Sequence, residues 1–261
     1  MEPKIGLALG AGGARGFAHI GAIQVLEKNN IPIDFIAGCS IGSLIGALYS
    51  MGHDGETLER FASLFRHKFY FDFMFPKMGF ISGNKVKELI HLLTQGKKIE
   101  ELAIPLSIVA ADLHTGEKVV FRDGNIADAV RASISIPGIF VPENIDGRYF
   151  VDGSVVDRVP VSVVKEMGAD VIIAVDVFNL KTKQQITSIF DVILQSLDIM
   201  QNEMVRYHEL KTDIIIRPDL SNYSLRSFED ANELIQLGKR ETEKQLANIE
   251  KAIENWKESH A

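Results

Sequence analysis

Short apolar runs rich in β-branched residues alternate along this chain with longer segments whose apolar residues recur at helical spacing. This alternation is typical of an α/β fold, in which helices connect the parallel strands of one sheet. The runs with the length of strands are Ile5–Leu9, Ile33–Ala37, Leu106–Ala111, Lys118–Phe121, Arg148–Val151, Val171–Val177 and Asp213–Arg217. The pattern therefore predicts a three-layer α/β/α sandwich with a mostly parallel central sheet.

Two helical segments bracket this pattern. The first, Gly16–Asn29, lies between the first two predicted strands. The second, Ser227–Trp256, predicts a terminal helix on the core, bent at Gly238, because glycine costs up to about 1 kcal/mol relative to alanine in a helix interior. A membrane or partner helix is the alternative there. With no internal repeat or linker, we predict one domain over residues 1–261, with a motif-bearing core at about 4–177 and a strand and helix at about 213–256 packed on it.

Composition narrows the class of protein. The 261 residues are 46% hydrophobic and 24% charged, which is enough to bury a sizeable core. A net charge of −7 without a Lys/Arg tract argues against nucleic acid as a partner. The single cysteine, Cys39, cannot form an internal disulfide, and no secretory leader or uncharged run of about 20 residues is present. We expect a cytoplasmic protein, with contact to a membrane surface left open.

Ser40 lies in Gly38-Cys39-Ser40-Ile41-Gly42, between the predicted strand that ends at Ala37 and the helical stretch Leu44–Met51. A strand-to-helix turn with this pattern is a nucleophile elbow. Glycines at 38 and 42 take backbone angles that other residues resist, and the helix N-terminus points at a developing oxyanion. The pentapeptide alone is common, so its place between strand and helix is the informative part. It indicates a serine hydrolase.

A glycine-rich loop, Gly10-Ala11-Gly12-Gly13-Ala14-Arg15-Gly16, follows the first strand and precedes a helix, so its N–H groups can form an anion cradle. A dinucleotide loop would need glycine where Arg15 stands, and a phosphate loop would end in Gly-Lys-Ser/Thr. Facing Ser40, the same N–H groups would form an oxyanion hole, in which each donor lowers the barrier by about 3 kcal/mol. A purely structural turn is the alternative.

A serine nucleophile needs a base, and the histidines are poorly placed for that role. His208 lies inside a helical stretch and His260 lies in the charged tail, whereas a triad histidine belongs in a loop after a strand. In contrast, Asp152 follows a short strand directly, and Gly153 permits close approach of a neighbour. Asp152 is therefore a candidate partner for Ser40. No cluster of His, Cys, Asp or Glu has metal-ligand spacing, so no metal or other cofactor is expected.

Together, these blocks resemble the signature of the patatin-like phospholipases. They are the glycine loop at 10–16, Gly-Cys-Ser-Ile-Gly at 38–42, and Asp152-Gly153-Ser154. The segment Arg131–Phe140 resembles the stretch that the family places shortly before its catalytic aspartate. The resemblance covers about residues 4–177, and the nearest relatives expected are small bacterial members.

The resemblance implies a Ser-Asp dyad without histidine. Ser40 would attack an ester carbonyl, Asp152 would act as base and then acid, and the N–H groups of Gly12, Gly13 and Ala14 would bind the oxyanion. Arg15 would hold the glycine loop or an anionic head group, with Gly10 and Gly16 as part of the loop's support. Two positions depart from the family pattern, because Ala11 stands where glycine is common and Ser154 stands where glycine or alanine is common.

Phenylalanine is concentrated in one segment, which holds seven of the chain's 15 Phe between Phe61 and Phe80, together with Tyr70. In one interpretation, Phe61 and Phe65 lie on a helix face and the other rings fill a satellite core. In the other, the segment is a mobile cap that lines an acyl pocket or enters a lipid interface, since the rings would otherwise form a large exposed patch.

The sequence thus predicts a lipid acyl hydrolase that forms an acyl-enzyme on Ser40 and acts on a phospholipid, lysophospholipid or other carboxyl ester. Two alternatives remain: a Ser-His-Asp esterase that uses His208, and a non-catalytic lipid-binding or regulatory protein on the same fold. The head group, the acyl length and the oligomeric state are left open.

Overall fold

The computed structural model describes residues 1–65, 72, 74–75, 77–178, 186–207, 211–226 and 228–260, with side chains omitted at 204–207. Its centre is an eight-stranded sheet with the order β10-β9-β1-β2-β4-β8-β7, in which β5 also pairs with β4. The strands are β1 (Ile5–Leu9), β2 (Phe35–Cys39), β4 (Leu106–Asp112), β5 (Lys118–Phe121), β7 (Glu143–Ile145), β8 (Arg148–Asp152), β9 (Val171–Val175) and β10 (Ile214–Ile216). β10, β9, β1, β2 and β4 are parallel, whereas β5, β7 and β8 pair antiparallel.

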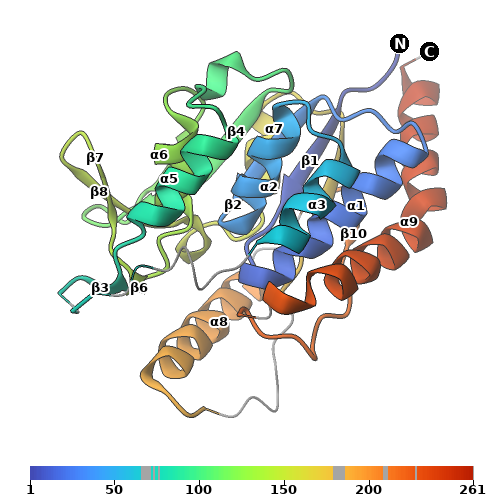
Figure 1. Ribbon diagram of the computed structural model, residues 1–261. Helices are drawn as coiled ribbons and strands as arrows, with labels where there is room; N and C mark the ends of the chain where they lie inside the picture. The colour runs from blue at the N-terminus through green and yellow to red at the C-terminus, as the bar shows by residue number, and fades with distance from the viewer. Residues whose placement is uncertain are drawn as a thin grey trace.

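Helices cover both faces of the sheet, as Figure 1 shows. The helices are α1 (Phe17–Lys28), α2 (Ile41–Ser50), α3 (Gly55–Leu64), α5 (Asn84–Leu93), α6 (Ile126–Ser133), α7 (Val161–Glu166), α8 (Ile189–Tyr207) and α9 (Ala231–Ser259). The 3-10 turns are η1 (Gly13–Gly16), η2 (Ile99–Glu101), η3 (Gly153–Val155) and η4 (Phe228–Asp230), and β3 (Gly79–Ile81) pairs with β6 (Gly138–Phe140) in a separate small sheet. The arrangement confirms the predicted α/β sandwich with a mostly parallel sheet.

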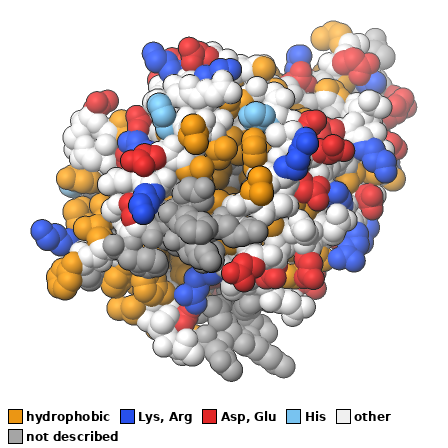
Figure 2. All heavy atoms as spheres, in the orientation of Figure 1, with side chains coloured by type: hydrophobic (Ala, Val, Ile, Leu, Met, Phe, Trp, Pro, Cys, Tyr) orange, Lys and Arg blue, Asp and Glu red, His pale blue; other side chains and the backbone are white. Residues whose placement is uncertain are grey.

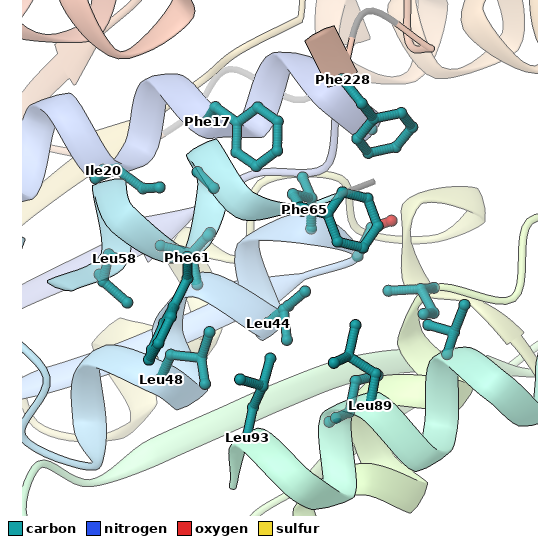
Figure 3. A pocket seen from close by; sticks show the side chains of 18 of the residues that line it. Phe17, Ile20, Leu44, Leu48, Leu58, Phe61, Phe65, Leu89, Leu93 and Phe228 are labelled. Carbon is teal, nitrogen blue, oxygen red and sulfur yellow. The ribbon is translucent and has the colours of Figure 1, made fainter. Parts of the chain in front are cut away.

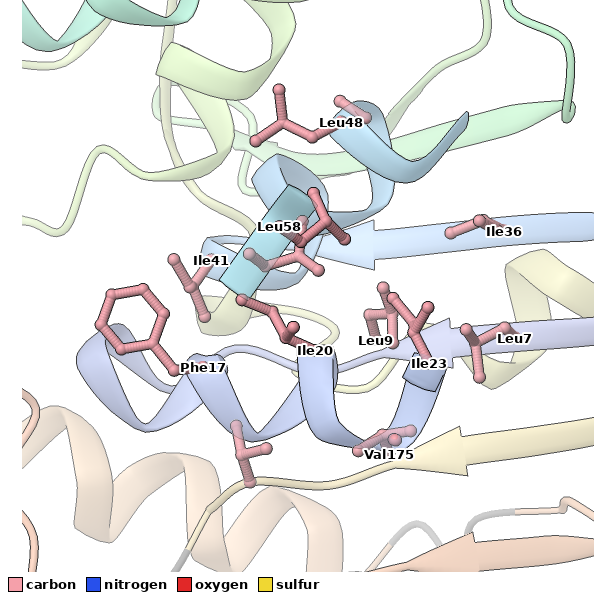
Figure 4. Close-up of a cluster of buried hydrophobic side chains, with 14 of the residues drawn as sticks. Leu7, Leu9, Phe17, Ile20, Ile23, Ile36, Ile41, Leu48, Leu58 and Val175 are labelled. Carbon is pink, nitrogen blue, oxygen red and sulfur yellow. The ribbon is translucent and has the colours of Figure 1, made fainter. Parts of the chain in front are cut away.

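Alternation along the strands divides the core into two layers. Leu7 and Leu9 of β1 join the larger cluster with α1, α2, α3 and α9, whereas Ala8 points to the opposite face and packs near α7. Figure 4 shows part of the larger cluster between β1, β2 and the helices above them. Because side chains alternate across a strand, one β1 sequence supplies large residues to the thick layer and a small residue to the thin one.

The C-terminal helix α9 lies along α1, and glycines allow this contact. A Cβ at Gly238 would lie 2.0 Å from the Ala18 carbonyl oxygen, and one at Gly21 would lie 2.0 Å from the carbonyl oxygen of Ile235. Gly238, where we predict a bend, lies inside the single helix Ala231–Ser259. Its role here is close packing of two helix backbones.

Most strand predictions differ from the structure by one or two residues at their ends. The largest shift is at β2, which starts at Phe35 and continues to Cys39, so that Ser40 follows the strand directly. In the phenylalanine-rich segment, Phe61 lies on α3 and Phe65 directly follows it, and both pack against the main core. The rings at 69, 71 and 73 lie outside the described residues, so the cap interpretation of this segment stays a prediction.

Candidate active site

β4 brings two strand ends together, because β2 and β8 share one of its edges. β2 pairs in parallel with the first part of β4, with Cys39 opposite Val109. β8 runs in the opposite direction along the following residues, with Asp152 opposite Ala110, while β5 occupies the other edge. The carboxyl ends of β2 and β8 therefore meet, and this places Ser40 next to Asp152.

Ser40 occupies the sharp turn between β2 and α2, with φ of 53° and ψ of −125°. Positive φ is strained for a residue other than glycine, and such strain gathers at functional sites. The flanking glycines do not take the unusual backbone angles predicted for them, since neither has a positive φ. Space requires them instead, because a Cβ at Gly38 would lie 2.5 Å from the Ser43 Cα, and one at Gly42 would lie 2.2 Å from the Leu9 carbonyl oxygen. The turn thus presents the serine as a nucleophile elbow does.

The Ser40 hydroxyl donates a hydrogen bond to Asp152, with 2.6 Å between Oγ and Oδ2. Both residues are buried. The second carboxylate oxygen accepts the Ser154 N–H at 2.9 Å. Burial raises the pKa of Asp152, while hydrogen bonds from Ser40 and Ser154 lower it in part. A carboxylate with a raised pKa accepts a proton more readily than a solvated aspartate, which is what a serine nucleophile needs.

A second buried serine supports the elbow. The Ser133 hydroxyl accepts the N–H of Ser40 at 2.8 Å and donates to the Val109 carbonyl at 2.6 Å. It therefore ties Ser40 to β4. Cys39, next to Ser40, is fully buried, and burial raises the pKa of its thiol well above the usual range. Cys39 is therefore a packing residue, as its neighbours in the thin layer indicate.

The glycine loop lies beside the dyad, and Gly12 and Gly13 line a small space together with Ser40 and Asp152. Within the described part of the chain, no hydrogen bond occupies the N–H of Gly12 or Gly13. The third predicted donor behaves differently, because Ala14 gives its N–H to the Leu225 carbonyl at 2.9 Å. In this structure the open donors are thus those of Gly12 and Gly13.

Two buried side chains hold the loop in place. Arg15 donates from Nε to the Tyr223 carbonyl at 2.9 Å, which fits support of the loop. His19 lies 2.8 Å from the Gly10 carbonyl through Nε2, and burial lowers its pKa to about 4, so its neutral ring donates there. Gly16 is also fixed by space, since a Cβ there would lie 2.3 Å from a methyl group of Ile41.

An apolar cavity opens from Ser40 and runs over α2, between α3 and α5. Its volume is about 140 Å³. Except for Ser40 and Gly13, all the residues that line it are hydrophobic. Figure 3 shows Leu48, Phe61 and Leu93 together at one end, and Phe17, Phe65 and Phe228 at the other. In Figure 2, hydrophobic side chains reach the surface in the region between α3 and α5.

On the other side of Ser40 the free space is much smaller, about 40 Å³. Its wall is α8, which contributes Leu194, Leu197, Asp198 and Gln201, and Leu225 closes it further. The Gln201 amide donates to the Ser154 hydroxyl oxygen at 2.9 Å. Burial raises the pKa of Asp198 to about 6.

The other candidate residues lie elsewhere. His260 stacks on Trp256 near the end of α9, and His208 lies outside the described residues. Within the described ranges, no group of three or more His, Cys, Asp or Glu side chains could hold a metal ion. In the same part of the chain, no helix is both long and apolar enough to cross a membrane.

Ser40 lies in a turn between a strand and a helix and is hydrogen-bonded to a buried carboxylate, within an α/β sandwich. This arrangement is typical of a serine hydrolase. Residues 7–165 match the patatin-like phospholipase family model. The chain is 37% identical over 176 residues to an uncharacterized NTE family protein of Mycobacterium tuberculosis, covering 67% of this chain and 49% of that protein. It is also 36% identical over 185 residues to a lysophospholipase of Mycosarcoma maydis, covering 68% of this chain and 10% of that protein. The chain therefore belongs to the patatin-like phospholipase family.

A human relative agrees with this assignment, and a solved structure has a similar fold. Patatin-like phospholipase domain-containing protein 6 of Homo sapiens is 34% identical over 181 residues, which cover 66% of this chain and 13% of that protein. VipD from Legionella pneumophila has a similar fold, with a TM-score of 0.54 and 14% identity, covering 97% of this chain and 67% of VipD. The chain spans about half, or much less, of the length of the curated relatives it matches.

Proposed function

We propose that this protein is a serine lipid acyl hydrolase that cleaves carboxyl esters through a Ser40–Asp152 dyad. The observation that carries the proposal is the 2.6 Å hydrogen bond between Ser40 Oγ and Asp152 Oδ2 at the mouth of an apolar cavity. A hydrolase of small polar esters would have no use for such a lining. The lysophospholipase among the relatives agrees with the same substrate class.

In the proposed first step, Ser40 Oγ attacks the ester carbonyl while its proton passes to Asp152. The tetrahedral intermediate collapses, the carbon–oxygen bond to the alcohol breaks, and Asp152 returns the proton to the departing alkoxide. The acyl group is then bonded to Ser40 Oγ. In the second step, water attacks this ester, Asp152 accepts the proton of the water, and the fatty acid leaves as Ser40 regains its hydrogen.

The weak point of such a dyad is basicity, because the reference pKa of aspartate is about 3.9 and that of histidine about 6.5. Burial of Asp152 works in the needed direction, since it raises the pKa of that carboxyl. The N–H groups of Gly12 and Gly13 would supply the remaining stabilisation, as each oxyanion donor is worth about 3 kcal/mol. Their nearness to Ser40 in one small space supports that role.

The acyl chain would lie in the apolar cavity along α2. Leu44 and Leu48 line it, one and two turns beyond Ser40. Eight residues of helix advance about 12 Å, roughly the length of an extended chain of nine or ten carbon atoms. Each buried methylene contributes about 0.8 kcal/mol to binding. We therefore propose esters of at least medium-length acyl chains as substrates.

The test is hydrolysis of p-nitrophenyl octanoate and of a lysophospholipid by the wild type, Ser40→Ala and Asp152→Asn. We expect kcat to fall at least about 10³-fold in both variants, because the nucleophile or its base is removed. Ser50→Ala is a matched control, since Ser50 lies on α2, is buried, and its hydroxyl has no partner among the described residues.

Labelling by a fluorophosphonate separates the competing mechanisms. Covalent labelling at Ser40 that is lost in Asp152→Asn supports the dyad, and retained turnover in His208→Ala argues against a triad. Loss of turnover in His208→Ala, with Asp152→Asn still active, would contradict the dyad. Lipid binding without any turnover or labelling would instead favour a non-catalytic lipid-binding protein.

A further inference from the structure

Helix α8 lies apart from the helices that cover the sheet, at the edge where the parallel strands end (Figure 1). Its Leu194, Leu197 and Gln201 face the dyad across a space of about 40 Å³. One water needs at least about 10–15 Å³ of such space, so only a few waters fit. The space is therefore narrow for the alcohol part of a lipid ester, and a shift of α8 would widen it.

Among the described residues, few polar contacts fasten α8 in this position. On its inner face, the Gln201 amide donates to Ser154 Oγ at 2.9 Å. At its N-terminal end, Asp191 accepts a hydrogen bond from Arg226 at 2.7 Å, and an ion pair whose Arg226 side chain is 58% exposed contributes little to stability. The remaining attachment is apolar packing on the core by partly buried side chains of α8, namely Phe190, Ile193 and Leu194.

The outer face of α8 is exposed and carries four apolar side chains together with Ser196 and Glu203. Ile189, Val192, Ile199 and Met200 are each 50–59% exposed. At 100° per residue, these four positions fall within an arc of about 100°, opposite the side that faces the dyad. The helix thus has apolar side chains turned outward, which is the reverse of a helix that only packs on a core.

A second group of exposed apolar residues lies close to this face. Met74, Phe75 and Met78 precede β3 and are 42–86% exposed. Figure 2 shows hydrophobic side chains gathered around β3, at the lower left, beside the region of α8. Ring contact between Phe80 of β3 and Phe190 of α8, with centroids 4.7 Å apart, joins the two elements. Met74, Phe75 and Met78, here called the β3 rim, thus precede a strand that contacts α8.

We propose that α8 is a lid, and that a zwitterionic lipid surface opens it by taking up the outer apolar face and the β3 rim. This inference rests on the proposed function, because a lipid hydrolase meets its substrate in an aggregate. A protein partner is not favoured by this composition, because protein interfaces concentrate Trp, Tyr and Arg and none of these is among the four apolar outer residues of α8. The net charge of −7 opposes binding to anionic lipid, so burial of apolar side chains is the driving force.

The test compares the wild type with the double variant I199Q/M200Q, which makes the outer face polar and leaves the inner face intact. The matched control is L64Q/L92Q, because Leu64 and Leu92 are 75% and 73% exposed on α3 and α5. The probe is the rate of fluorophosphonate labelling of Ser40, with and without phosphatidylcholine vesicles. Labelling does not require turnover of any lipid.

Vesicles should raise the labelling rate of the wild type and of L64Q/L92Q about tenfold, and that of I199Q/M200Q less than twofold. Arg226→Ala should raise the rate without vesicles, since it releases Asp191. Co-sedimentation with the vesicles should weaken in I199Q/M200Q alone.

Equal acceleration by vesicles in I199Q/M200Q would overturn the proposal. A change from dimer to monomer in that variant, with unchanged vesicle binding, would also overturn it and assign the face to self-association. If Ser40 is never labelled under any condition, the proposed function fails instead, and co-sedimentation still tests the lipid-binding face.

Discussion

The two sides of Ser40 differ in how they are built. The acyl side is a cavity of about 140 Å³ whose walls, such as Ile45, Leu48 and Ile90, belong to the main hydrophobic core. The opposite side has about 40 Å³, and α8, which has exposed apolar residues behind it, lines it together with residues such as Ile136, Phe178 and Leu225. One side is therefore a larger cavity within the core, and the other is a narrow space that α8 helps to enclose.

The difference follows from where each wall is attached. α2 starts immediately after the nucleophile, so its apolar face is aligned with Ser40 by the backbone itself. α8 comes about 150 residues later and reaches the dyad only through contacts such as Gln201 with Ser154. A wall that is part of the core resists movement, because its displacement would expose the core, whereas α8 packs on the core only through partly buried side chains such as Phe190 and Ile193.

The largest effect expected from this comparison concerns the acyl side. Leu93→Asp places a carboxylate in the apolar lining, and desolvation of that group should weaken binding of a long chain. We expect kcat/KM for a decanoate ester to fall about 10–100-fold, with the acetate ester changed less than threefold. Kinetics on a p-nitrophenyl ester series measures this directly.

Leu92→Asp is the matched control, because it makes the same change one residue earlier, on the exposed side of α5. It should leave all esters unchanged. An equal loss on acetate and decanoate in Leu93→Asp, with a normal circular dichroism spectrum, would show that the cavity does not hold the acyl chain.

A smaller effect is expected on the closed side, from Asp198. Burial raises the pKa of this carboxyl to about 6, and the charged groups that act on it are Arg15 of η1 and Arg158 before α7. The closed form therefore binds the proton more tightly than an open form in which Asp198 is hydrated. The free energy that this proton contributes to closure is fully present below the ordinary aspartate pKa of about 3.9. It is lost as pH rises through about 6.

Hydrogen exchange of the α8 amides, corrected for the intrinsic rate, tests this linkage. In the wild type, opening should increase several-fold between pH 5 and pH 7.5. Asp198→Asn cannot titrate and should remove that increase, while it leaves the titration of Asp152 in place. The same pH dependence in both proteins would show that the titration of Asp198 does not control the movement of α8.

Some parts of the site could be predicted from the sequence, and others could not. Ser40 and Asp152 could be found because Ser40 directly follows β2 and Asp152 ends β8, and the end of a strand is a local feature. Asp152 was a candidate partner of Ser40 on that ground, but their direct contact depends on β8 running antiparallel along the edge of β4 that β2 leaves. The spacing of hydrophobic residues in either strand does not indicate such pairing.

Other parts of the site have no local signal at all. The hydroxyl of Ser133 reaches the Ser40 N–H from 93 residues away. The Ala14 N–H, predicted to be an oxyanion donor, meets the Leu225 carbonyl in a loop more than 200 residues later. The His19 ring, on α1, forms a hydrogen bond with the Gly10 carbonyl. Such contacts are set by tertiary structure, which hydrophobic periodicity does not encode.

The smallest effect expected links the two sides through Ser154, the residue where the family pattern commonly has glycine or alanine. Its hydroxyl oxygen accepts the Gln201 amide, and its hydrogen bonds lower the pKa of Asp152 against the larger effect of burial. Ser154→Ala keeps the backbone N–H and removes the hydroxyl, so the pKa of Asp152 should rise. Because Asp152 must be ionised to act as base, the acid limb of the kcat/KM profile should move to higher pH. Ser162→Ala, at a surface serine near Lys118, should leave the limb in place. A limb that moves to lower pH in Ser154→Ala would mean that the Ser154 hydroxyl does not stabilise the carboxylate.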